Sequence, residues 1–189
     1  MAPEPTPASD PAAEDRALMR RVQAGDEAAF AALMQRWERP VKALIGRIVL
    51  NARDADELAQ DAFVRLWQHR DRWRPDAAFR PWLLAIAVNL ARNRLRWWRS
   101  RPEVALEDWT DAGAVEGAAV AAERAERARA VQAAVAALPT DQRTVLILAE
   151  YEQLSQREIA ALVGGTAKAV ERRLARARET LRARLGAGR

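Results

Sequence analysis

Residues 155–178 read SQREIAALVGGTAKAVERRLARAR, and this stretch decides how the last third of the chain folds. Ser155 and Glu158 form the S-x-x-E pattern of a capping box, which satisfies free backbone amides at a helix start. Gly164 breaks that short helix because glycine tolerates a left-handed turn, and Thr166 is a good N-cap for a longer second helix. A short helix, a tight turn and a basic second helix predict a helix-turn-helix that fits the major groove of DNA.

The second helix of this motif separates an apolar stripe from a basic face. Helical spacing predicts burial of Val170, Leu174, Ala177, Leu181 and Leu185. The other face can bond to base edges or to phosphates, and spacing does not decide which side chain does which. A helical hairpin with a solvated basic face is the structural alternative. The candidate DNA contacts are Thr166, Lys168, Glu171, Arg172 and Arg176.

Composition limits the other functions open to this chain. The 189 residues carry a net charge of +5, and much of the hydrophobic half is alanine, which favours small helical domains. The absence of cysteine excludes disulfides, thiol catalysis and thiolate zinc sites. His69 is a single imidazole, and neither an acidic metal cluster nor a glycine-rich phosphate loop is visible. We therefore expect no catalytic residues, no metal, no cofactor, no enzymatic activity and no small-molecule substrate.

The N-terminal segment and the hydropathy pattern bear on location. No apolar run approaches the roughly 20 residues that span a bilayer, so we expect no membrane insertion. Residues 1–15 contain prolines and acids with no basic residue, which is unlike a signal peptide and typical of a disordered tail. The sequence suits a cytoplasmic protein.

Helical periodicity dominates from residue 16 to about residue 100, and no stretch alternates long enough to be a strand. Asp26 is expected to cap one helix, and Pro40 to interrupt or kink it. Asp54 is expected to cap the next helix. A further helix is predicted from about Phe79 to Arg99. The fold class is therefore all-α.

An acidic segment divides the chain into two small helical domains. Residues 102–127 are rich in alanine and glycine, and the pattern fades there, which indicates a flexible linker whose end enters a helix near Ala118. The next helix is expected to start at Pro139-Thr140-Asp141. The predicted organisation is a tail at 1–15, a domain at 16–101, a linker at 102–127 and a helix-turn-helix domain at 128–186.

Four motifs in order resemble those of sigma-70-type factors. The first is GDEAAF at 25–30, similar to GDxxAF. The second is DADELAQDAFVRLW at 54–67, which resembles the DAEDLVQEVFLRLW stretch of region 2, and the third is FRPWL at 79–83 followed by IAVN at 86–89. Leu138-Pro139, Leu154-Ser155 and the helix-turn-helix resemble region 4. Because the chain has no room for further domains, it looks like the extracytoplasmic-function (ECF) group.

The resemblance implies a promoter-specificity subunit that binds core RNA polymerase and directs transcription initiation. Region 2 would bind the minus-10 element and dock on the beta-prime clamp helices, while region 4 would bind the minus-35 element and touch the beta flap. An anti-sigma factor is also implied. The implied minus-10 contacts are Trp73, Arg74, Phe79, Asn89, Arg92 and Arg96, and the implied polymerase contacts are Asp56, Glu57, Gln60, Asp61 and Arg65.

Other interpretations remain open at this point. A helix-turn-helix regulator would bind duplex DNA without the polymerase. Trp82 is expected in the core, and Trp97 and Trp98 either pack or stack on bases. Glu171 and Arg172 stand where many relatives carry arginine then serine, and Pro75 replaces a common glycine. The promoter sequence therefore cannot be transferred from the family.

Overall fold

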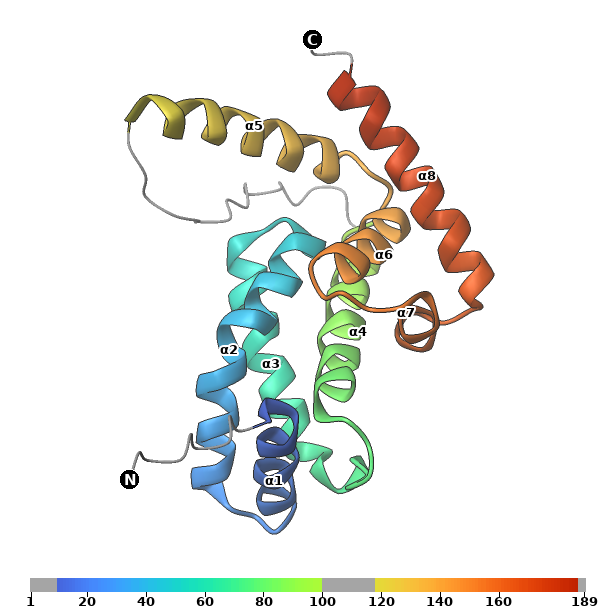
Figure 1. The fold of residues 1–189 in the computed structure, drawn as a ribbon. Coiled ribbons are helices and arrows are strands. Elements are labelled where there is room, and N and C mark those ends of the chain that lie inside the picture. The colour runs from blue at the N-terminus through green and yellow to red at the C-terminus, as the bar shows by residue number, and fades with distance from the viewer. Residues whose placement is uncertain (1–9, 100–117, 187–189) are drawn as a thin grey trace, which may run out of the picture.

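The computed structural model describes residues 10–99 and 118–186, and this part of the chain is helical with no strand. Figure 1 shows the helices in order. They are α1 (Pro11–Gln23), α2 (Glu27–Val49), α3 (Ala52–Gln68), the 3-10 turn η1 (Arg70–Arg72), α4 (Phe79–Arg99), α5 (Ala118–Ala136), α6 (Thr140–Glu150), α7 (Gln156–Val163) and α8 (Ala167–Gly186). The predicted all-α fold class is confirmed.

We call α1 to α4 the first module and α5 to α8 the second module. In the first module α2, α3 and α4 lie side by side, with α1 against one end (Figure 1). Asp26 caps α2 as predicted, because its side chain accepts a hydrogen bond of 3.0 Å from the Ala29 amide. The prediction that Asp54 caps α3 is wrong. The N-cap is Asn51, whose side chain accepts a hydrogen bond of 2.8 Å from the backbone amide of Asp54.

Pro40 does not interrupt the helix, although the sequence predicted that it would interrupt or kink it. It lies inside α2, which continues to Val49 as one helix. Leu33 before the proline and Val41 and Leu44 after it are fully buried in the same core. Packing on both sides of Pro40 thus outweighs the cost of one missing amide donor.

The predicted tail at 1–15 includes residues that the structure places in a helix. Residues 1–9 lie outside the described part, but α1 already begins at Pro11 behind an Asp10 cap. Asp15 is buried and accepts hydrogen bonds from Arg36 at 2.8 Å and from the Trp37 indole at 3.1 Å. An ion pair between the buried Asp15 and Arg36 therefore holds a segment that composition alone assigned to a tail.

Two helices of the second module begin where the sequence predicts. A helix starts at Ala118 and the next one at Thr140, as expected. The acidic linker falls mostly on residues 100–117, outside the described residues, so its predicted flexibility stays a prediction.

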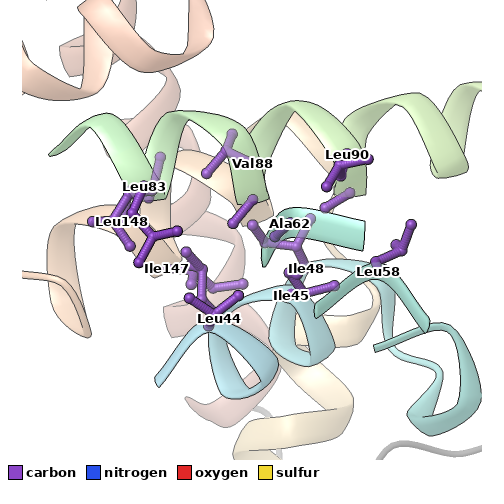
Figure 2. Packing of buried hydrophobic residues seen from close by; sticks show 14 of the residues in the cluster. Leu44, Ile45, Ile48, Leu58, Ala62, Leu83, Val88, Leu90, Ile147 and Leu148 are labelled. Atoms are coloured by element: carbon purple, nitrogen blue, oxygen red, sulfur yellow. The ribbon is translucent and has the colours of Figure 1, made fainter. Parts of the chain in front are cut away.

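The two modules share one continuous core. Ile147 and Leu148 of α6 are fully buried, and they lie against Leu44 and Ile45 of α2 and Leu83 of α4 (Figure 2). α7 packs on α4 as well. The sequence predicted two small helical domains joined by a linker and did not predict this packing, because helical periodicity indicates which face of a helix is buried but not which element covers it.

Candidate nucleic-acid and polymerase interfaces

The first helix of the helix-turn-helix begins with the predicted capping box. The Ser155 side chain accepts a hydrogen bond from the Glu158 amide at 3.3 Å. The Glu158 carboxylate in turn accepts from the Ser155 amide at 2.8 Å and from the Ser155 hydroxyl at 2.6 Å. These hydrogen bonds hold the pKa of the Glu158 carboxyl below its usual range, since they favour the ionised form.

The turn between the two helices requires glycine for its backbone conformation. Gly164 and Gly165 have φ values of 81° and 109°, which L side chains rarely adopt. Thr166 then accepts a hydrogen bond of 3.2 Å from the Ala169 amide, as an N-cap does. The sequence prediction for this turn is confirmed.

The second helix, α8, presents its basic face to solvent. Val170, Leu174 and Ala177 are buried as predicted, whereas Leu185 is exposed, so the buried stripe is shorter than expected. The stripe ends where α8 extends past α6 and α7 (Figure 1). All five candidate minus-35 contacts are exposed, with Thr166 just before α8 and the others in its first half: Lys168, Glu171, Arg172 and Arg176.

The polar candidates for minus-10 contact lie mainly along α4. Asn89 and Arg96 are exposed, and Arg96 bonds to the Asn93 amide oxygen. Arg74 is exposed in the loop before α4 and pairs with Asp76 at 3.0 Å. These three side chains are accessible to nucleic acid.

The two aromatic candidates require a correction. Trp73 and Phe79 are both only 2% exposed. Phe79 packs against the rings of Trp37 and Trp82, with centroids 6.0 Å and 6.4 Å away. Large apolar rings at both ends of a short loop anchor it to the core, so they support the loop from beneath and do not contact DNA in this arrangement. Gln23 also fixes the loop by donating to the Trp73 carbonyl at 2.7 Å.

The other tryptophans follow the packing interpretation in part. Trp82 is half-buried against the core, as expected, and Trp98 packs there too. Trp97 is 44% exposed on α4. The sequence could not separate these two neighbours, because they stand 100° apart around the helix and only one of them meets the core.

The candidate polymerase contacts share an exposed surface of α3. Asp56, Glu57, Gln60, Asp61 and Arg65 are all exposed. Two of these acids are anchored by basic residues of other helices: Asp56 pairs with Lys42, and Glu57 with Arg94 at 2.8 Å. The arginine lowers the pKa of the Glu57 carboxyl by hydrogen bonding.

Arg94 has a structural role that the sequence did not reveal. Besides Glu57, Arg94 also pairs with Asp54, which is buried. Burial raises the pKa of the Asp54 carboxyl in spite of the neighbouring guanidinium. Arg94 thus ties α4 to α3 and is engaged within the first module.

Two arginines of α4 reach across to the second module. Arg80 donates from Nη2 to the backbone carbonyl and to the carboxylate of Glu152, both at 2.8 Å. Arg92, a candidate minus-10 contact, donates from Nη1 to the Val163 carbonyl at 2.6 Å. Arg92 is therefore bound to the end of α7, which the sequence did not predict.

Two further contacts cross between the modules near the end of α2. Arg143 of α6 is buried and donates from Nε to the Ile48 carbonyl at 3.0 Å. The guanidinium of Arg47 lies 4.3 Å from the ring centroid of Tyr151, as in a cation–π contact.

Two further features, a metal site and a membrane-spanning helix, can be checked for the described residues. Within 10–99 and 118–186 there is no group of three or more His, Cys, Asp or Glu side chains placed to hold a metal ion. The described helices also include none that is long and apolar enough to cross a membrane.

The structure thus combines a helical bundle with exposed acids on α3 and a helix-turn-helix with an exposed basic face, which is an arrangement typical of DNA-binding proteins. Comparison with protein families matches "Sigma-70 region 2" to residues 33–101 and "Sigma-70, region 4" to residues 128–181. The chain therefore belongs to the sigma-70 family of RNA polymerase sigma factors, which are non-catalytic transcription initiation factors.

Similar proteins agree over most of the chain. The RNA polymerase sigma-H factor of Pseudomonas aeruginosa is 36% identical over 177 residues, which cover 89% of this chain and 92% of that protein. The ECF RNA polymerase sigma-E factor of Escherichia coli is 34% identical over 176 residues, 88% of this chain and 92% of that one. These matches support polymerase-directed, promoter-specific initiation over the regulator that would act without polymerase.

Solved structures match the fold. CnrH, solved in complex with the cytosolic domain of CnrY, aligns with a TM-score of 0.68 and 29% identity over 92% of this chain and 98% of CnrH. The sigma factor RpoE of Bartonella quintana, solved with the anti-sigma factor NepR, aligns with a TM-score of 0.66 over 85% of this chain and 98% of RpoE. The two sequences are 22% identical, so this match shows the same fold.

Proposed function

We propose that this ECF-type sigma factor divides promoter recognition between its two modules. The first module docks on the polymerase through α3 and binds the minus-10 element along α4. The second module binds the minus-35 element with the outer face of α8. We assign the first module to the predicted domain at 16–101 and the second module to the predicted domain at 128–186.

The observation that carries this proposal is the exposed basic face of α8, which follows the glycine turn and the N-cap at Thr166. Lys168, Arg172 and Arg176 recur every four residues, so they follow one face of the helix, and all three are exposed. Such a face can enter a major groove while the buried stripe remains on α6 and α7. Glu171 lies beside it and can accept a hydrogen bond from cytosine.

For the minus-10 element we propose Asn89, Arg92, Arg96 and Arg74 as the contacts. Asn89 has donor and acceptor groups for a base edge, and the arginines suit phosphates or unpaired bases. Trp73 and Phe79 then act indirectly, because they hold the loop that precedes α4.

Run-off transcription with core RNA polymerase over a pool of genomic promoters tests this function. We expect the protein to make the core enzyme start at discrete sites. A regulator that acts without the polymerase would bind duplex DNA but would leave start-site selection unchanged. Starts that do not depend on the added protein would contradict the proposal.

The remaining expectations concern partners and location. We propose that an anti-sigma factor holds this chain inactive; the related CnrH was solved with a protein domain bound to it. We also propose that the chain has no catalytic activity of its own. We also propose a cytoplasmic location, because the proposed function requires binding to RNA polymerase and promoter DNA.

A further inference from the structure

One side chain of α1 bonds to the start of the loop that precedes α4. Gln23 is the last residue of α1, and its Nε2 donates to the carbonyl of Arg70 at 3.0 Å and to the carbonyl of Trp73 at 2.7 Å. A side-chain amide has two N–H donors, so these bonds use both. They join α1 to residues 47 and 50 positions further along the chain, and they form at a half-buried position.

The Trp73 carbonyl sets the direction in which the loop leaves the core. This carbonyl belongs to the planar peptide unit that joins Trp73 to Arg74. Because the Trp73 ring is buried, a hydrogen bond to its carbonyl fixes the backbone rotation that remains, the ψ angle of 133°. That rotation determines where the backbone of Arg74 begins. Gln23 therefore orients Arg74, a proposed minus-10 contact, from the opposite side of the loop.

Contacts within the loop hold the shape of its exposed tip. The Ala77 amide donates to the Arg74 carbonyl at 2.9 Å, which closes a turn. The Arg74 guanidinium donates to the Asp76 carboxylate from Nε at 3.2 Å and from Nη2 at 3.0 Å. Since these contacts lie inside the tip, they do not fix its direction relative to the first module. That direction depends on the base of the loop, where Gln23 bonds.

α1 makes a second, weaker contact with the tip. Arg20 donates from Nη2 to the Pro75 carbonyl at 3.5 Å, at an exposed position. This distance exceeds the usual range for N–H···O hydrogen bonds, and water competes for both groups. Gln23 is therefore the stronger of the two connections between α1 and the loop.

We propose that Gln23 is a positioning residue for promoter recognition, which holds the loop so that Arg74 meets the unpaired strand of the minus-10 element. This inference rests on the proposed function. A loop that already has its bound conformation avoids the entropy cost of becoming ordered when DNA binds. Loss of the Gln23 amide should thus weaken DNA binding although no DNA contact is removed.

Gln23→Met in the full-length chain tests this role. Methionine has a similar length and shape but no N–H donor. The matched control is Val22→Ala on the same helix, because Val22 is fully buried and its truncation lowers stability while both bonds to the loop remain. Gln23→Glu, which has no donor when ionised, is the second variant should Gln23→Met fail to fold. Circular dichroism establishes the folding of each variant.

The first readout is amide hydrogen exchange of the loop, followed by mass spectrometry. The Trp73 amide donates to the Arg70 carbonyl at 3.2 Å, so its exchange reports on opening at the base of the loop. The loop should exchange at least about fivefold faster in Gln23→Met, because local opening no longer breaks the two bonds of Gln23. Val22→Ala should leave this local exchange as in the parent. Exchange that is equal in Gln23→Met and the parent would overturn the proposal, whatever the result with DNA.

The second readout is the affinity of the holoenzyme for fork-junction DNA. The probe is taken from the strongest start site of the run-off experiment, with its minus-10 strand unpaired. Gln23→Met should weaken binding by about five- to tenfold, since the loop must now be ordered on binding. Val22→Ala should weaken it by less than about twofold, because the folded molecules keep the loop in place. Equal losses would mean that lower stability alone explains the effect, and the proposal would be wrong.

A double-mutant cycle shows whether Gln23 acts through Arg74. In an Arg74→Ala background, Gln23→Met should weaken binding by no more than about twofold, because the side chain that it orients is gone. A merely structural role of Gln23 predicts the same loss in both backgrounds, and that result would also overturn the proposal. A parent holoenzyme that selects no start site would instead contradict the proposed function, and the loop exchange would still decide whether Gln23 holds the loop.

Discussion

The buried guanidinium of Arg143 donates a hydrogen bond of 3.0 Å to the carbonyl of Ile48, in the last turn of α2. Its Nη1 donates another, of 2.9 Å, to the carbonyl of Ala136 at the end of α5. Carbonyls in the last turn of a helix lack partners within that helix. One side chain therefore satisfies the ends of two helices, one in each module.

Replacement of Arg143 by alanine should reduce the free energy of unfolding by about 2–3 kcal/mol, because buried carbonyls lose a charged donor. Urea unfolding followed by far-UV circular dichroism measures this loss. Arg39→Ala, at an exposed position of α2, should change stability by no more than about 0.5 kcal/mol. If Arg143→Ala reduces the free energy of unfolding no more than Arg39→Ala does, the two hydrogen bonds of Arg143 make no net contribution to stability.

Removal of two charges from α8 should make binding to minus-35 duplex DNA less sensitive to salt. Each phosphate contact contributes about −0.9 to the slope of log affinity against log salt, so Lys168→Ala with Arg176→Ala should make the slope shallower by about 2. Fluorescence anisotropy between 50 and 200 mM salt (roughly the range in which such slopes are measured) provides the test.

The control for that experiment removes the same charge elsewhere. The control variant combines Arg16→Ala on α1 with Arg39→Ala on α2, so it loses two charges away from α8. Its slope of log affinity against log salt should equal that of the parent protein. If both double variants shift the slope equally, net charge explains the effect and the assigned face of α8 is wrong.

Loss of the capping hydroxyl should destabilise the helix-turn-helix. Ser155→Ala removes the acceptor of the Glu158 amide and should cost about 1 kcal/mol of unfolding free energy. Because α7 positions α8, affinity for minus-35 DNA should fall as well. Ser155→Asp keeps an acceptor at the N-cap and should preserve both stability and affinity; equal behaviour of the two variants would exclude the cap as the cause.

Local signals in the sequence predicted the second module well. Ser155, Gly164 and Thr166 act on backbone groups within three or four residues of themselves, so their effect can be read without knowledge of the rest of the fold. The same holds for Asp26. These positions have the structure that the sequence predicts.

Features that depend on distant partners could not be predicted in this way. Pro40 remains inside a helix because of burial on both sides, and Asp15 is ordered by Arg36, 21 residues away. Arg92 is bound to Val163 across 71 residues. No local pattern marks these contacts, and for this reason the sequence did not predict the partner of Arg92 or the packing between the two modules.

Charge reversal on α3 should weaken capture by core RNA polymerase. Asp61 is exposed on the proposed docking surface, and Asp61→Arg should lower affinity for the core enzyme by about tenfold or more, since like-charge contacts at an interface cost several kcal/mol. Asp71→Arg, exposed on η1, is the matched control and should bind as the parent does. Size-exclusion chromatography with core enzyme measures the fraction of each variant that elutes in the complex. If this fraction is the same for Asp61→Arg and the control, the proposed docking surface on α3 is wrong.

The capping box should also make stability depend on pH. The pKa of Glu158 is lowered in the folded chain, chiefly by its hydrogen bonds with the Ser155 side chain, so the folded state binds fewer protons than the unfolded state. Its stabilisation is therefore fully present above the unfolded pKa of about 4.3 and is lost as the pH falls through the lowered value. Glu158→Gln keeps a capping side chain without the charge.

The Tm difference between the parent and Glu158→Gln should accordingly be present at neutral pH, shrink below about pH 4.3 and vanish at lower pH. Thermal unfolding by circular dichroism across this range measures it. In a Ser155→Ala background the difference at neutral pH should be smaller, because the hydroxyl is absent and only the hydrogen bond from the backbone amide of residue 155 still favours the ionised carboxyl. A Tm difference that is constant with pH would mean that the charge on Glu158 does not stabilise α7, and the capping box would then act through its neutral hydrogen bonds alone.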